Sequence, residues 1–337
     1  MSRVPLSVLD LSPVSTGSTP ADALRSSTEL AQRVDALGYH RLWVAEHHNM
    51  PGIASTAPAV LIAHLASATE RIRVGSGGVM LPNHPPLVVA EQFAMLEALH
   101  PDRIDLGIGR APGTDPRTAA ALRRTTEGLN AEQFPQELVD LVAYLNRDIQ
   151  PAVTTDDDEL VDFSPRPGVV PSIWLLGSSG YSAQLAGLLG LPFSFAHHFS
   201  AVNTLPALEL YRSHFRPSRF LAEPYAMVAV SAIVADTHAE AERLSMSGKL
   251  SFVRLRSGRP GTLPSPEEAE RYDFTPADQH LLAGRGNAHV FGDPDEVLAS
   301  LDGLRAETVA DELMVTTMVH DPAARIRSYE LLAKAWL

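Results

Sequence analysis

The chain of 337 residues contains no cysteine. This absence excludes disulfides, iron–sulfur clusters, zinc fingers and cysteine nucleophiles. No apolar run reaches the length of about 18 residues that a membrane-spanning helix needs. The first residues also lack the charged and apolar regions of a signal peptide. We therefore expect a cytoplasmic protein with no membrane partner.

Basic residues are also scarce. The chain has 27 Lys and Arg against 40 Asp and Glu, a formal net charge of -13. An acidic chain with scattered cations binds nucleic acid poorly, so no nucleic-acid partner is expected. Hydrophobic residues make up 45% of the chain and charged residues 20%, which is typical of a globular protein. A chain of this length buries about 75% of its unfolded surface, enough for a large core.

Short apolar runs rich in β-branched residues alternate with longer segments of helical spacing. Eight such runs predict an α/β fold, a (β/α)8 TIM barrel, as a single domain over residues 1–337. The alternative is a doubly wound sheet, but neither Gly107-x-Gly109 nor Gly284-x-Gly286 completes a dinucleotide-binding fingerprint. The strand-like runs cover 4–11, 40–46, 72–80, 104–110, 173–176, 192–196, 227–235 and 312–319.

Helices are predicted between these runs. The first is opened by Ser18-Thr19-Pro20 and stopped by Gly38. Residues 254–292 are rich in glycine, proline and charge and show no clean period, so we interpret them as an insertion before the last strand. The other predicted helices cover 56–68, 86–99, 131–147, 182–189, 202–215, a segment from 239 into the 240s, and a last helix containing 326–336.

Function in such a barrel lies at the C-terminal ends of the strands. There, Gly177-Ser178-Ser179-Gly180 joins a strand to a helix, and its backbone N–H groups and hydroxyls could surround a phosphate. Arg110 leaves the preceding strand at the same rim and could neutralise a phosphate. Taken singly, the loop could be a capped turn and Arg110 a surface ion-pair former. Together they favour a phosphate site.

Three glycines in Gly75-Ser76-Gly77-Gly78 end a strand that should be buried. They could form a bend of the barrel wall. They could also let a flat ligand lie directly against the backbone, where strained or non-proline cis peptides gather.

Two histidine pairs, His47-His48 and His197-His198, follow predicted strands. Adjacent strand residues point to opposite sides, so one histidine of each pair can face a pocket. This geometry favours a single acid–base histidine over a metal site, and no metal is predicted. A metal-dependent hydrolase stays an alternative that depends on these pairs alone.

The rim segments, in this order and spacing, resemble the bacterial luciferase-like monooxygenases, which are flavin-dependent (β/α)8 barrels. The resemblance extends through about the whole chain and is greatest for the single-type luciferase-like oxidoreductases. The segments that carry it are 42–48, 73–86, 105–115, 176–183, 195–199 and 312–317.

The resemblance implies where the cofactor and substrate bind. The ring of flavin mononucleotide (FMN) would pack on Gly77 and Gly78. His47 matches the family's catalytic histidine and would move a proton at the ring's reactive edge. The residues implied for the phosphate are Arg110, Gly177, Ser178, Ser179 and the start of the next helix, Gly180 and Tyr181. Those predicted for the substrate pocket are Met80, His84, His197, His198 and Phe199.

By this resemblance the protein is a monooxygenase that uses reduced FMN and O2 to oxygenate an unidentified organic substrate. The chain shows no separate nicotinamide-binding signature, which favours a partner NAD(P)H:flavin reductase. One alternative is an F420-dependent hydride-transfer oxidoreductase, and another is a non-catalytic flavin-binding protein. Apolar residues cover more than one stripe of the helices at 57–65 and 86–99, and with the resemblance they predict a homodimer.

Overall fold

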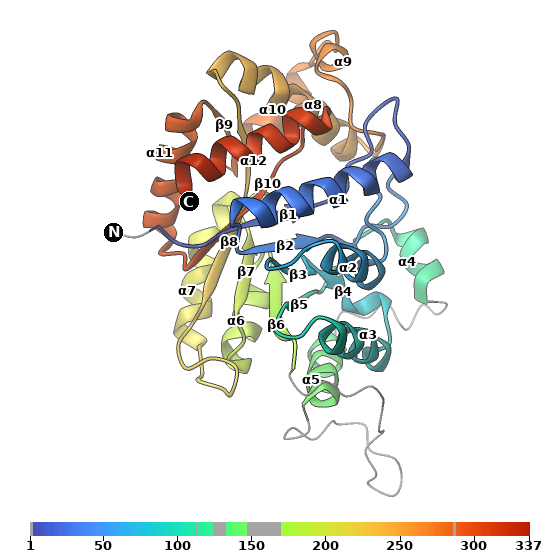
Figure 1. Ribbon diagram of the computed structural model, residues 1–337, viewed down its shortest axis with the longest axis vertical. Coiled ribbons are helices and arrows are strands. Elements are labelled where there is room, and N and C mark those ends of the chain that lie inside the picture. The colour runs from blue at the N-terminus through green and yellow to red at the C-terminus, as the bar shows by residue number, and fades with distance from the viewer. Residues whose placement is uncertain (1–2, 112, 124–132, 147–169, 286–287) are drawn as a thin grey trace, which may run out of the picture.

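A barrel of eight parallel strands occupies the centre of the computed structural model, which describes residues 3–111, 113–123, 133–146, 170–285 and 288–337 (Figure 1). Neighbouring strands pair in chain order around the ring, and β10 pairs with both β1 and β8, which closes it. The predicted TIM barrel is confirmed. The eight strands are β1 (Leu6–Asp10), β2 (Arg41–Val44), β3 (Arg73–Ser76), β5 (Ile104–Gly109), β6 (Ser172–Gly177), β7 (Phe193–Ala196), β8 (Ala226–Val234) and β10 (Glu312–Thr316).

Two further short strands extend the sheet. β4 (Val79–Met80) follows β3 and pairs with β5. β9 (His289–Gly292) pairs with the C-terminal half of β8, from Ser231 to Val234. β8 is long enough to pair with β10 at one end and β9 at the other, so β9 extends one side of the barrel beyond its rim.

Helices surround the barrel (Figure 1). The two termini lie side by side, because the Trp336 indole donates to the carbonyl of Val4. The α-helices are α1 (Pro20–Leu37), α2 (Pro58–Ser67), α3 (Pro86–Leu99), α4 (Pro116–Arg123), α5 (Phe134–Leu145), α6 (Gly180–Leu189), α7 (Thr204–His214), α8 (His238–Arg256), α9 (Pro266–Glu270), α10 (Pro276–Ala283), α11 (Pro294–Thr308) and α12 (Pro322–Trp336). The 3-10 turns are η1 (Leu81–Asn83) and η3 (Ala201–Asn203).

Local sequence signals set the ends of α1 as predicted. Thr19 is its N-cap, and the Thr19 hydroxyl and the Asp22 carboxylate each accept a hydrogen bond from the other residue's backbone N–H, a capping box. Gly38 ends the helix in the left-handed region, with φ of 87°.

The core has two layers. The larger lies between the outward face of the sheet and the helices, and includes Val8, Leu42 and Phe93. The smaller fills the barrel itself, where Trp43 and Trp174 meet edge to face with their ring centroids 5.2 Å apart. These rings fill the lower interior, so that any cavity must lie above them, toward the C-terminal ends of the strands.

Below the tryptophans, a buried ion network occupies the N-terminal ends of the strands. The guanidinium of Arg41 donates to Asp105 and to Glu312, both at 2.7 Å. Arg73 adds a second contact to Asp105 at 2.6 Å. Burial raises the pKa of Asp105, but Arg41 and Arg73 outweigh it and hold that pKa below its usual range. This end of a TIM barrel serves stability rather than chemistry.

The structure departs from the sequence prediction chiefly before the last strand. α8 extends to Arg256, and the segment interpreted as an insertion contains α9, α10 and β9. Sequence periodicity missed α9 and α10 because they have only 5 and 8 residues, and α4 and α11 were not predicted either. The third predicted strand divides into β3 and β4 at Gly77–Gly78, which is a cis peptide. Of the helix predicted over 131–147, residues 131, 132 and 147 lie outside the described residues.

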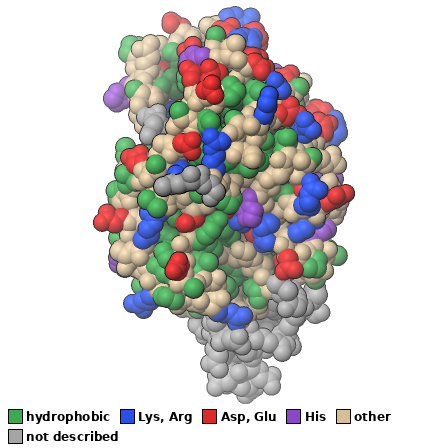
Figure 2. Space-filling model, turned by 60° about the vertical axis from the view of Figure 1, so that its left-hand side comes forward, with side chains coloured by type: hydrophobic (Ala, Val, Ile, Leu, Met, Phe, Trp, Pro, Cys, Tyr) green, Lys and Arg blue, Asp and Glu red, His purple; other side chains and the backbone are tan. Residues whose placement is uncertain are grey.

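Acidic and basic side chains are interspersed over the face seen in Figure 2, with hydrophobic side chains between them. Within the described residues, no helix combines the length and the apolar character that crossing a membrane requires.

Candidate functional site

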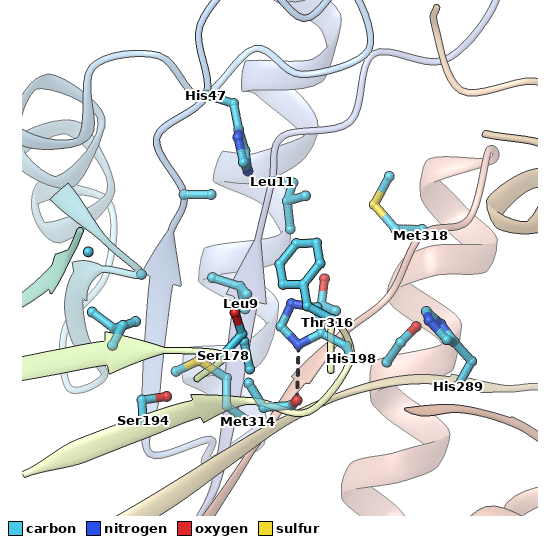
Figure 3. Close-up of a pocket in the computed structure, with 18 of the residues that line it drawn as sticks. Leu9, Leu11, His47, Ser178, Ser194, His198, His289, Met314, Thr316 and Met318 are labelled. Carbon is cyan, nitrogen blue, oxygen red and sulfur yellow. Dashed lines mark hydrogen bonds between the residues drawn. The ribbon is translucent and has the colours of Figure 1, made fainter. Parts of the chain in front are cut away.

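The C-terminal ends of the strands enclose a cavity of about 460 Å³. Apolar side chains from β1, from β10 and from the residues that follow these strands line it, among them Leu9, Leu11, Met314 and Met318 (Figure 3). Ten of the residues predicted for the site line this one cavity: His47, Gly77, Gly78, Met80, Arg110, Gly177, Ser178, Ser179, His198 and Phe199.

Four predicted residues do not line it. Gly180 begins α6, and the ring of the next residue, Tyr181, lies 4.3 Å from the Arg110 guanidinium carbon. His84 turns to the carboxylate of Glu46 instead of the cavity. His197 is buried and its Nδ1 lies 2.8 Å from the Thr204 hydroxyl. His84 and His197, which the sequence predicts for the substrate pocket, therefore do not line this cavity, and Tyr181 packs against Arg110.

The loop between β6 and α6 presents an anion-binding geometry. Ser179 is the N-cap of α6, yet its side chain makes no capping hydrogen bond. The first N–H groups of α6 are therefore left for a ligand, and a helix N-terminus favours an anion. A Cβ at Gly177 would lie 2.6 Å from the Cβ of Ser182, so only glycine lets the loop pack this closely on the helix.

Arg110 faces the same loop across the rim. Its guanidinium stacks on Tyr181, a cation–π contact that fixes its plane. Among the described residues, no carboxylate oxygen lies within ion-pairing distance of it. No described acidic side chain therefore neutralises its charge, which lies beside the first residues of α6.

Backbone forms the wall between β3 and β4. A Cβ at Gly78 would lie 2.7 Å from the carbonyl oxygen of Gly107, and one at Gly77 would lie 2.8 Å from a methyl group of Leu9. A Cβ at Gly78 would thus meet backbone, and one at Gly77 would also lie 3.1 Å from the Cβ of Trp43, so both positions favour glycine. A wall without side chains lets a flat ligand approach the backbone closely.

Glu46 links the segment after β2 to the segment that follows Gly78. It is fully buried, and its Oε1 accepts from His48, His84 and Asn83, while its Oε2 accepts from the backbone N–H of Met80, at 2.9–3.0 Å. Burial raises the pKa of Glu46, but the hydrogen bonds and charge of its partners outweigh it and hold the pKa below its usual range. Glu46 thereby fixes the segment that follows the Gly77–Gly78 wall.

His47 points from the end of β2 into the cavity (Figure 3). Its Nδ1 lies 3.2 Å from the carbonyl oxygen of Gly113. Because a carbonyl can only accept, Nδ1 carries the proton and Nε2 has the lone pair. Burial lowers the pKa of His47 below 6.5, so the ring is neutral near pH 7 and can accept a proton. His48 turns away to Glu46, as alternation along the chain predicts.

His198 is the cavity-facing member of the second pair. Its Nδ1 donates to the carbonyl of Ala229 at 2.9 Å (Figure 3). Burial lowers the pKa of His198 to about 4. Within the described residues, no three His, Asp or Glu side chains converge as they would to hold a metal ion.

Sequence reasoning missed one side of the cavity. Lys249, Phe252, Arg285, His289 and Phe291 line it from α8, from the end of α10 onward and from β9. The signal that could have found them is the short apolar run His289-Val290-Phe291, followed by Asp293-Pro294, a strand and then a helix N-cap.

Comparison with known proteins identifies the class. Residues 4–312 match the family model for luciferase-like monooxygenases, and the chain belongs to this family of oxidoreductases. A luciferase-like monooxygenase of Escherichia coli (strain K12) is 46% identical over 331 residues, which cover 97% of this chain and 96% of the relative. The N-acetyl-S-alkylcysteine monooxygenase of Bacillus subtilis (strain 168) is 35% identical over 342 residues, covering 98% of each. The crystal structure of apo-MsnO8 has a TM-score of 0.89 at 40% identity, with 98% of both chains covered.

Proposed function

We propose that the protein is an FMN-dependent monooxygenase that uses reduced FMN and O2 to oxygenate a small organic molecule. The observation that carries this proposal is the convergence of three features on one cavity. They are the N-terminus of α6 beside an arginine that no described carboxylate pairs, a wall of bare backbone, and a half-buried histidine whose pKa is lowered. Family membership supports the same chemistry.

The residues present fit FMN. Arg110, Ser178, Ser179 and the start of α6 would hold the phosphate, because they combine a free cation with hydroxyl and backbone donors. Gly77 and Gly78 would hold the ring, since both line the cavity with backbone that carries no side chain. Reduced FMN would supply the electrons that activate O2.

The chain's own residues control water and protons around that chemistry. The apolar side chains of Leu9, Leu11, Met314 and Met318 keep the inner cavity dry, which suppresses wasteful formation of hydrogen peroxide. His47 can hold a proton at Nε2 and return it, because its Nδ1 is engaged by Gly113.

The reducing equivalents and the assembly belong to the same proposal. A separate NAD(P)H:flavin reductase would supply reduced FMN in the cytoplasm.

A homodimer through α2 and α3 is supported by the exposed apolar side chains Val60, Val88, Met95 and Leu99, which are 72%, 40%, 50% and 63% exposed. Light scattering at micromolar concentration should give twice the 36.3 kDa chain mass; a monomer mass would contradict the dimer.

The test of function is a coupled assay with a flavin reductase, NADH, FMN and O2, with N-acetyl-S-alkylcysteines as the first substrate panel. These are the compounds that the name of the Bacillus subtilis relative gives. His47→Ala should keep its FMN affinity within a few fold. It should lower product formed per reduced FMN at least about tenfold and release more hydrogen peroxide, because a general acid–base group typically contributes 10²–10⁴-fold.

His48→Ala is the matched control. His48 contacts Glu46 outside the cavity lining, so its loss should lower stability more than coupling. Equal coupling in His47→Ala and the wild type would refute the role of His47. Binding of F420 in preference to FMN, or FMN binding without O2-dependent product from any substrate, would refute the monooxygenase proposal.

A further inference from the structure

Two cations line the cavity beside β9, whose residue His289 lies well apart from Ser178 in Figure 3. They are Lys249 on α8 and Arg285 after α10. Each lies over an aromatic ring: the Lys249 ammonium is 4.8 Å from the ring centroid of Phe291, and the Arg285 guanidinium carbon is 4.5 Å from that of Phe252. Aromatic faces hold a cation in place while leaving its hydrogen-bond donors for another group.

Neither cation is neutralised. Within the described part of the chain, no carboxylate oxygen lies within 4 Å of either cation. Burial lowers the pKa of Lys249, and the more distant charge of Glu242 offsets this only in part. Arg285 donates from its Nη2 to Nδ1 of His289, at 2.6 Å, and makes no other hydrogen bond within the described residues. Burial and the charge of Arg285 lower the pKa of His289 to about 3, so His289 is a neutral acceptor and not a counter-charge.

Burying a cation without a counter-charge is costly. Burial lowers the pKa of Arg285 to about 10 with no opposing contribution from an acid, and Arg285 is still charged at neutral pH. A ligand anion would relieve this cost. FMN would carry its phosphate at Arg110, so Lys249 and Arg285 are left for another molecule.

We propose that Lys249 and Arg285 form an anion subsite that binds the carboxylate of an apolar organic acid, the substrate of the proposed oxygenation. The wall between this subsite and His47 is mostly apolar, which suits a hydrocarbon chain or ring. Arginine and lysine favour a carboxylate through charge-assisted hydrogen bonds. The inference rests on the proposed function for its chemistry, but binding at the subsite does not require turnover.

The position of the subsite also gives the substrate an orientation. His47 and His289 lie on opposite sides of the cavity, with His198 between them (Figure 3). A substrate held by its carboxylate at Lys249 and Arg285 would therefore present its far end to His47. The oxygenated atom is then remote from the carboxylate.

Calorimetric titration with neutral and anionic probes tests this subsite apart from catalysis. Octanoate and 4-phenylbutanoate are titrated into the FMN-loaded protein beside their uncharged amides, octanamide and 4-phenylbutanamide. At least one carboxylate should bind at least about tenfold more tightly than its amide. Arg285→Met and Lys249→Met should each weaken carboxylate binding at least about tenfold, the loss expected for a charged hydrogen bond. They should change amide and FMN binding less than twofold.

Arg243→Met is the control. Arg243 also lies on α8 but pairs with Glu267 at the surface, so it tests the effect of net charge alone. Equal affinity for acid and amide, no binding of either carboxylate at millimolar concentration, or equal loss in Arg243→Met would overturn the subsite. Loss of FMN affinity in Arg285→Met would also overturn the subsite, because it would show that Arg285 binds the cofactor and not a substrate carboxylate. Failure of oxygenation with intact carboxylate binding would refute the proposed function and leave the subsite standing.

Discussion

Glu46→Gln is a small change at the most connected residue of the rim. The wild-type carboxylate accepts from four donors, on His48, His84, Asn83 and the backbone of Met80. A glutamine offers one carbonyl oxygen and two amide hydrogens. If the glutamine carbonyl accepts from the N–H of Met80, its two amide hydrogens face the side chains of His48, His84 and Asn83. Even if the histidines change tautomer and the asparagine amide rotates, two hydrogens serve only two of these three side chains, and the third loses its hydrogen bond to residue 46.

The magnitude follows from burial. Glu46 is 0% exposed, so water cannot replace the lost partner. Hydrogen bonds to charged groups contribute about 1.5–3 kcal/mol each, and an unsatisfied buried group costs a similar amount. The substitution also removes the charge that strengthens the other bonds. We expect the free energy of unfolding to fall by about 2–4 kcal/mol.

Urea denaturation at pH 7 measures this loss. Glu209→Gln, the same change at an exposed position of α7, should stay within about 0.5 kcal/mol of the wild type. Glu46→Gln should also weaken FMN binding, because the segment after the Gly77–Gly78 wall loses its attachment. A loss of stability below about 1 kcal/mol would refute the reasoning, since it would mean that the four contacts do not act together.

Two further predictions concern stability. Arg41→Met should lower the free energy of unfolding by about 3–5 kcal/mol in urea, because Asp105 and Glu312 are left buried without their shared cation; a loss below 1 kcal/mol would contradict this. Burial lowers the pKa of His198 to about 4 in the folded protein, from 6.5 in the unfolded chain. As the pH falls below 6.5, the unfolded chain takes up a proton at His198 that the folded protein does not, so acidification lowers the free energy of unfolding. Between pH 7 and pH 5 His198 should account for roughly 2 kcal/mol of that loss, and a His198→Asn variant with an undiminished loss would contradict the assignment.

Much of the fold could be predicted because its signals are local. The Thr19 cap, the Gly38 stop and the alternation of apolar runs act over a few residues, and each agrees with the structure. The segment before the last strand differs. Its helices are too short to show a period, and β9 is defined by pairing with β8, whose register the sequence does not display.

The site also contains residues whose positions follow from a local pattern and residues whose positions depend on contacts between distant segments. Alternation along the chain predicts that His47 and His48 diverge, and they do. The burial of Glu46 by Met80, Asn83 and His84 depends on a contact across 34 to 38 residues, and it explains why His84 is turned from the cavity. Lys249 and Arg285 line the same cavity only once α8 and β9 have packed together. No local sequence pattern therefore predicts that these two cations share a site.

Arg110 and the Ser178–Ser179 loop are proposed to hold the phosphate of FMN. Calorimetric titration of FMN and of riboflavin, which lacks the phosphate, into wild type and Arg110→Ala measures what the phosphate contributes. FMN binding should weaken by about 1.5–3 kcal/mol in the variant, the range for a charged hydrogen bond. Riboflavin binding should change less than twofold. Equal losses for the two ligands, or a wild type that does not distinguish them, would show that Arg110 and this loop do not bind the phosphate.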